Sequence, residues 1–119
     1  MTSEVEFNNM VAALAKPGHE IMASLTQNEC HLIHMVLGIS GEAGELLDAV
    51  KKHTVYNKPL DRQNVIEELG DLEFYMQGLR DSLSISREET LKATIDKLGK
   101  RYPNRSYSNQ DAIARADKQ

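Results

Sequence analysis

The sequence predicts an all-α protein, folded as a four-helix bundle or a close relative of one. Apolar residues recur every three or four positions along the chain, and no stretch alternates apolar and polar residues as a half-buried β-strand would. The 119 residues include only three prolines and seven glycines, which leaves room for long unbroken helices. Short connections between such helices favour antiparallel neighbours, as in a bundle.

Two helices are expected in the first half of the chain. The first covers about Glu4 to Ala15 and ends where proline and glycine follow each other at residues 16–18. The second begins near Thr26, whose side chain can cap the helix while Glu29 returns the contact of a capping box. Its apolar pattern continues to about Tyr56.

Two further helices are expected after the break at residues 57–60. Asp61 is a good N-cap for a helix that reaches about Ser82. Ser86 and Glu89 form a second capping-box pair, which opens a helix to Arg101, where Tyr102-Pro103 ends it. For the tail, the sequence leaves open a short helix over residues 108–116 or an irregular segment.

The length of the chain is that of one ordinary domain. We therefore expect a single module over residues 1–119, with a core at about 26–103 and a tail at 104–119. No apolar run approaches the roughly 20 residues that span a bilayer, and residues 1–6 contain two acidic and no basic side chains, unlike a secretory signal. These features predict a cytoplasmic protein with no membrane partner.

Charge and cysteine content narrow the function classes. The formal net charge of −4 argues against general nucleic-acid binding, which needs a basic face to displace counterions from phosphates. Cys30 is the only cysteine, so it has no partner within the chain for a disulfide or a shared zinc ion. We expect it to be a small buried residue.

Pairs of acidic residues lie beside the apolar stripes of the second and third expected helices. At about 100° per residue, Glu42 and Glu45 share a strip next to the stripe that we expect to be core, formed by Leu32, Met35, Ile39, Ala43, Leu46 and Val50. Glu68 and Asp71 lie in the same way beside Val65, Leu69, Leu72, Met76, Leu79 and Leu83. If the two stripes pack together, the four carboxylates converge at the border of the core.

Four converging carboxylates repel one another unless a cation lies between them. Ligand sets made only of oxygen suit Mg²⁺ or Mn²⁺, which also bind phosphate oxygens. The alternative is that the acids are the solvated faces of amphipathic helices. Asp48, Glu67 and Glu73 are further acids nearby; of these, Asp48 is a plausible extra member of the cluster and Glu67 a plausible outer neighbour.

The segment Gly41-Glu42-Ala43-Gly44-Glu45-Leu46, followed by Glu67-Glu68-Leu69-Gly70-Asp71, resembles the MazG-like all-α NTP pyrophosphatases. The 22 residues between Glu45 and Glu68 are a usual separation, and Lys100-Arg101-Tyr102-Pro103 is similar to the segment that ends the family's last helix. The resemblance covers about His31 to Pro103.

This resemblance implies hydrolysis of a nucleoside triphosphate between the α and β phosphates, giving a monophosphate and pyrophosphate. It implies that Glu42, Glu45, Glu68 and Asp71 are the catalytic acids and hold Mg²⁺, and that the enzyme works as a homodimer or homotetramer. Gly41 stands where many members have another acid, Lys51 and Lys52 where one dCTP-preferring branch has tryptophan, and Leu98 where an asparagine is common. Base and sugar preference therefore stay open.

Basic and aromatic residues supply candidate substrate contacts. Lys52, Lys97 and Arg101 are expected to contact phosphates, for which the arginine fork is well shaped. Tyr75, one helical turn after Asp71, is expected either to stack on a base or to pack half-buried between helices. Two other functions remain open: a phosphoribosyl-ATP pyrophosphohydrolase, and a non-catalytic helical interaction protein whose acids are surface residues.

Overall fold

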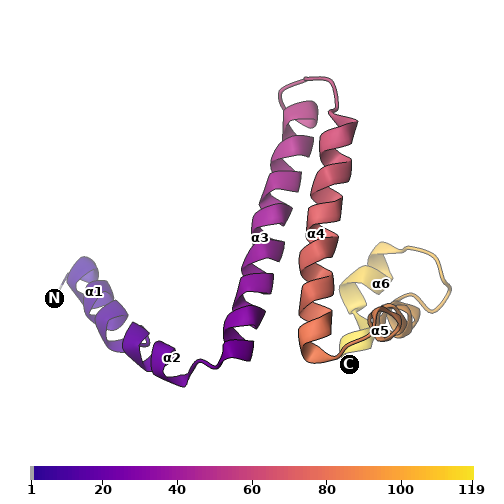
Figure 1. Ribbon diagram of the computed structural model, residues 1–119. Coiled ribbons are helices and arrows are strands. Elements are labelled where there is room, and N and C mark those ends of the chain that lie inside the picture. Colours follow the sequence, from indigo (N-terminus) through magenta and orange to yellow (C-terminus); the bar gives the residue numbers. More distant parts are fainter. Residues whose placement is uncertain (1) are drawn as a thin grey trace. The chain divides into compact units, whose positions relative to one another are not determined.

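The computed structural model describes residues 2–119, and the regular elements in that range are all helical (Figure 1). The all-α prediction is confirmed. The elements are α1 (Ser3–Leu14), α2 (Gly18–Ser24), α3 (Gln27–Thr54), α4 (Arg62–Leu83), α5 (Arg87–Arg101), α6 (Asn109–Ala114) and the 3₁₀ turn η1 (Ala116–Lys118). None of these helices is long and apolar enough to cross a membrane.

The chain separates into two compact units, one ending at His31 and the other spanning Leu32–Gln119. In the first unit α1 begins at Thr2, whose side chain accepts a hydrogen bond from the backbone N–H of Val5 at 3.2 Å. The short helix α2 was not predicted. No residue from 2 to 31 is buried, and Cys30 is exposed, so the prediction of a buried cysteine is wrong. That prediction rested on residue type alone, and this unit has no core to enclose the thiol.

The predicted caps place the starts of the longer helices. The Thr26 hydroxyl accepts from the Glu29 N–H at 3.2 Å, and an Asp61 carboxylate oxygen accepts from the Asn64 N–H at 3.1 Å. Ser86 and Glu89 form both halves of a capping box at the start of α5, with distances of 3.0 and 2.8 Å. Each helix therefore begins where its capping residue predicts.

Helices α3 and α4 lie side by side as an antiparallel hairpin (Figure 1). Two glycines fix how they pack. The Tyr75 ring of α4 fills the space where a Cβ of Gly38 would lie, and the Met35 side chain of α3 does the same at Gly78. Each helix thus inserts one bulky side chain against a glycine of the other, which sets the register of the hairpin.

This packing agrees with the predicted core only in part. The strip that faces the neighbouring helix is the one with Met35, Gly38 and the acids, and Met35 and Ala49 are the buried hydrophobic residues of the described chain. Met35 belongs to one of the two predicted apolar stripes, which we call the seams. Other seam residues, such as Ile39 and Leu72, are half-buried, while Val50 is 38% exposed and Leu69 51% exposed. The predicted core is therefore confirmed at Met35, whereas the rest of the two seams is half-buried or exposed within one chain.

The C-terminal segment packs against α5. Ser108 caps α6 by accepting from the Asp111 N–H at 3.0 Å, and the C-cap residue Arg115, directly after α6, has a left-handed φ of 48°. Helix α5 contacts both α6 and η1. Of the two possibilities left open for the tail, a short helix is correct, with η1 added after it.

Candidate active site

The register of the hairpin brings the predicted acids to the same level. One turn beyond Gly38 on α3 is Glu42, and one turn before Tyr75 on α4 is Asp71. A further step of three residues reaches Glu45 on α3 and Glu68 on α4. The two helices are antiparallel, so residues that follow Gly38 on α3 lie opposite residues that precede Tyr75 on α4. The pair Glu42 and Glu45 therefore faces the pair Glu68 and Asp71 across the interface.

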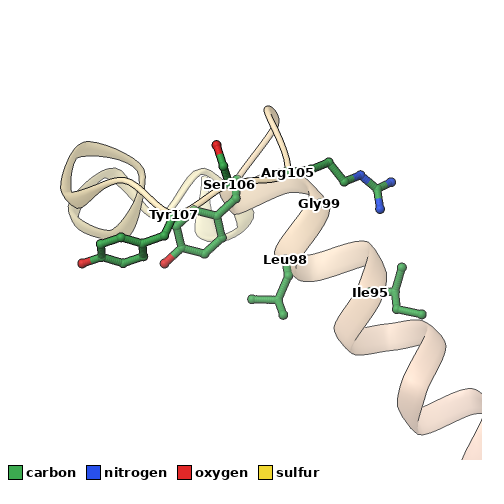
Figure 2. Close-up of a pocket in the computed structure, with 7 residues that line it drawn as sticks. Ile95, Leu98, Gly99, Arg105, Ser106 and Tyr107 are labelled. Carbon is green, nitrogen blue, oxygen red and sulfur yellow. The ribbon is translucent and has the colours of Figure 1, made fainter.

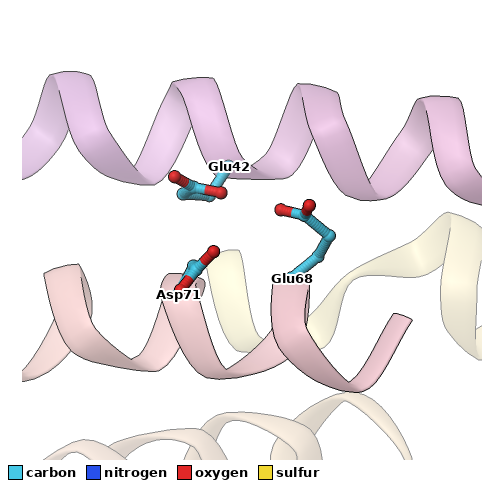
Figure 3. Close-up of side chains that lie close together, drawn as sticks. All are labelled: Glu42, Glu68 and Asp71. Atoms are coloured by element: carbon cyan, nitrogen blue, oxygen red, sulfur yellow. The ribbon is translucent and has the colours of Figure 1, made fainter. Parts of the chain in front are cut away.

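Carboxylate oxygens of Glu42, Glu68 and Asp71 lie within 4.8 Å of one another. Figure 3 shows Glu42 on α3 facing Glu68 and Asp71 on α4. We call these three residues the acid cluster. Three carboxylate oxygens at this spacing could hold one small, hard cation.

Two oxygens of the acid cluster are shielded from solvent without a partner. Oε2 of Glu42 and Oε2 of Glu68 are buried and accept no hydrogen bond from any described residue. Two ionised carboxylates have no donor between them, so neither can satisfy the other. An unpaired buried oxygen is costly, and a bound cation or a shared proton would remove that cost.

Crowding of the acids raises the pKa of Glu68 to about 7. The first cause is the Glu42 carboxyl, which lies close enough to share a hydrogen bond with the protonated form of Glu68; desolvation follows, and then the hydrogen bond and charge of Glu45. Glu45 therefore lies beside Glu68, although it is outside the acid cluster. Without a cation, the protonated form of Glu68 is therefore favoured up to about pH 7.

A family model for the MazG nucleotide pyrophosphohydrolase domain matches residues 31–106. The chain belongs to this family. No curated protein and no solved structure matches it. The matched range contains α3 from His31 onward, all of α4 and α5, and the Arg-Tyr-Pro segment. The acid cluster therefore lies inside the MazG domain.

The neighbouring acid Asp48 lies outside the acid cluster of the MazG domain. Its carboxylate pairs with Lys52 Nζ at 2.9 Å, and both side chains are more than half exposed. The hydrogen bond and charge of Lys52 lower the pKa of Asp48, and Asp48 in turn raises the pKa of Lys52. Glu67 is also outside the cluster and accepts a hydrogen bond from Gln63 at 3.5 Å.

Tyr75 is half-buried between the two helices of the MazG domain. Besides filling the gap at Gly38, its ring makes edge contacts with His34 and Phe74, with centroid separations of 6.1 and 5.2 Å. Of the two expected roles of Tyr75, the geometry favours packing.

Arg101 has a partner that the sequence did not reveal. Its Nε and Nη2 donate to the two carboxylate oxygens of Asp117 at 2.7 and 3.0 Å, and the Asp117 side chain is only 1% exposed. The hydrogen bonds from Arg101 hold the pKa of Asp117 at about 2, although burial opposes that shift. No local pattern links residues 101 and 117, because the contact depends on how the tail folds back on α5.

An apolar pocket of about 390 Å³ lies at the end of α5 (Figure 2). Its walls are Ile95, Leu98, Gly99, Tyr102, Arg105, Ser106 and Tyr107. The rings of Tyr102 and Tyr107 lie 5.9 Å apart between centroids. None of the four predicted acids lines this pocket, so it is a feature separate from the acid cluster, and the sequence did not predict it.

Proposed function

We propose that the chain is a metal-dependent nucleoside triphosphate pyrophosphohydrolase, which converts ribo- or deoxyribonucleoside triphosphates to monophosphates and pyrophosphate. The observation that carries the proposal is the acid cluster on a MazG-family hairpin, with two shielded oxygens that have no partner. Surface acids on solvated helices would have their oxygens in water, so the cluster argues against a purely structural role.

The residues fit a hard divalent cation. Glu42, Glu68 and Asp71 offer oxygens within 4.8 Å of one another, and Glu45 adds a fourth carboxylate beside Glu68. Such an all-oxygen set suits Mg²⁺, with Mn²⁺ as a substitute. When bound, the ion neutralises charge on the phosphates and makes water a better nucleophile at neutral pH.

The proposed reaction is hydrolysis at the α-phosphate, with an acidic residue as the proton acceptor. Water attacks the α-phosphorus, the bond between that phosphorus and the bridging oxygen breaks, and pyrophosphate leaves. A carboxylate of the four-acid group that is not bound to the ion accepts the proton of the attacking water. The packed α3–α4 interface holds these carboxylates at fixed positions before the substrate arrives.

Cationic side chains are proposed to bind the phosphates. Lys97 is exposed and lies four residues before Arg101 on α5, so the two share one face of that helix. Lys52 forms an exposed pair with Asp48, and exposed pairs exchange easily with a phosphate. We propose that Tyr75, while it packs between the helices, also forms part of the wall of the substrate site, one turn from Asp71.

We propose further that the enzyme is a homodimer or homotetramer. Both apolar seams of the hairpin are partly open, and Leu47 is 68% exposed beside them. A second copy of the chain that covers these seams would bury the side chains whose apolar pattern predicted a core. Because its substrates are nucleotides of the cellular pool, we expect the enzyme to act in the cytoplasm, without nucleic-acid or membrane partners.

The test is a screen for pyrophosphate release from all common NTPs and dNTPs, and from phosphoribosyl-ATP, with Mg²⁺ and with EDTA. We expect Mg²⁺-dependent release of equal amounts of nucleoside monophosphate and pyrophosphate. Release from phosphoribosyl-ATP alone would replace the general substrate class with that specific one. No hydrolysis together with no Mg²⁺ binding would favour a non-catalytic interaction protein.

A further inference from the structure

The contact between Arg101 and Asp117 joins the end of α5 to η1. Asp117 lies beyond residues 31–106, the range that the family model matches. Its side chain is 1% exposed and that of Arg101 is 19% exposed, so most of the ion pair is out of solvent. A two-point hydrogen-bonded pair of this kind fixes the plane of a guanidinium, which a single charge contact does not.

The pairing leaves one edge of the guanidinium unused. Asp117 takes Nε and Nη2, and no hydrogen bond from Nη1 meets the geometric limits among the described residues. The pKa of Arg101 is raised first by Asp117, with a smaller contribution from the Tyr102 hydroxyl, which lies near the guanidinium. An arginine has five N–H donors, so a second anion can be bound at the remaining edge while the first stays in place. The neighbouring Lys97 has no ion-pair partner among the described residues and lies on the same face of α5.

We propose that Asp117 is a positioning residue, which holds the Arg101 guanidinium so that its Nη1 edge donates to the triphosphate of the substrate. This inference rests on the proposed function, which assigns Arg101 to the phosphates. Without Asp117 the long arginine side chain would sample several rotamers, and its ordering on binding would reduce affinity for the substrate.

Asp117 could instead occupy Arg101 and compete with the phosphates. The surroundings of Asp117 argue against such competition. The 3₁₀ turn that carries it is closed by a hydrogen bond from the Lys118 N–H to the Arg115 carbonyl at 2.8 Å, and the side-chain Nε2 of Gln119 donates to the Ala114 carbonyl at 2.8 Å. To leave Arg101, the carboxylate would have to give up two hydrogen bonds, at 2.7 and 3.0 Å, at a position where it is only 1% exposed to water.

The experiment compares Asp117→Asn with the matched control Asp96→Asn, which removes an exposed pair with Lys92 from the same helix α5. Each variant is assayed for KM and kcat with Mg²⁺ and the best NTP of the screen, well below its melting temperature. We expect Asp117→Asn to raise KM by about tenfold with little change in kcat, and Asp96→Asn to change neither. In an Arg101→Gln background, Asp117→Asn should have no further effect on KM.

Other results would overturn the inference. A lower melting temperature with unchanged KM would make the pair purely structural, and a lower KM would make Asp117 a competitor of the substrate. If the wild-type chain hydrolyses no nucleotide, the proposed function fails, and the binding of inorganic triphosphate is measured in its place. Weaker binding by Asp117→Asn then still supports the positioning role, whereas equal binding contradicts it.

Discussion

The ring of Tyr75 occupies the space in which a side chain at position 38 would have to lie. This contact, together with that of Met35 at Gly78, sets the register that brings Glu42, Glu68 and Asp71 to one level. The geometry of the acid cluster therefore depends on a glycine one turn away from it.

We predict that Gly38→Ala destabilises the protein by about 1–3 kcal/mol, the usual cost of overpacking, because the rigid Tyr75 ring cannot move aside without separating the helices. Thermal or denaturant unfolding measures the change. Gly44→Ala is the matched control: no atom lies within 4 Å of its added methyl group, so the helix should gain up to about 1 kcal/mol. Equal stability of the two variants would mean that Gly38 does not set the register.

Gly78→Ala should cost less than Gly38→Ala. The atom that the new methyl group meets is the sulphur of Met35, near the end of a flexible side chain that can adopt another rotamer. The same unfolding measurement ranks the two variants. A larger loss for Gly78→Ala would show that the Met35 contact, and not the Tyr75 contact, is the more rigid of the two.

The metal-free protein should lose stability as the pH rises through about 7. The pKa of Glu68 is raised to about 7 in the fold from an ordinary value of 4.5, so folding favours its protonated form. The stabilisation that Glu68 provides is fully present below 4.5, its pKa in the unfolded chain. It is lost as the pH rises through about 7, its pKa in the folded protein. Melting in EDTA from about pH 5 to about pH 8 measures the loss, which Glu68→Gln should reduce.

At about pH 8, millimolar Mg²⁺ should raise the melting temperature above the value measured in EDTA. The reason is that the ion binds the folded acid cluster and not the unfolded chain. Calorimetry provides an independent measurement of binding. Identical melting temperatures in Mg²⁺ and EDTA, with no heat of binding, would show that the acid cluster does not hold the ion.

The protein should be at least a dimer in solution, as measured by light scattering at micromolar concentration. Replacing the half-exposed Leu69 with lysine should shift it toward smaller species, because a charge would enter the covered seam. A wild-type monomer would contradict the proposed assembly.

Local signals in the sequence were enough for the helix starts and for the acids. Thr26, Asp61 and Ser86 cap their helices through bonds to residues three positions away, and such short-range contacts are visible in the sequence. Helical periodicity likewise placed Glu42 and Glu45 on one strip, and Glu68 and Asp71 on another.

The sequence predicted the packing face only in part: Met35 is buried as expected, but Val50 and Leu69 are exposed. Apolar periodicity favoured the seams, but the fit of Tyr75 against Gly38 depends on the shapes of two helices at once. The pair between Arg101 and Asp117 joins residues sixteen positions apart through a folded tail, so it left no repeating pattern in the sequence. The apolar pocket at the end of α5 likewise depends on where the loop after Tyr102 folds back.

The most direct test of the central claim is the turnover of Glu45→Gln and Asp71→Asn, which keep the size of each side chain and remove its charge. We predict that each lowers Mg²⁺-dependent pyrophosphate release by orders of magnitude, since every lost decade is only about 1.4 kcal/mol of transition-state stabilisation. The metal-free melting temperature should stay the same or rise, because repulsion among the acids is relieved. The control Glu73→Gln removes a charge that lies near Arg80 and Arg87 and should leave turnover unchanged. Turnover close to wild type in both Glu45→Gln and Asp71→Asn would contradict the assignment of these acids.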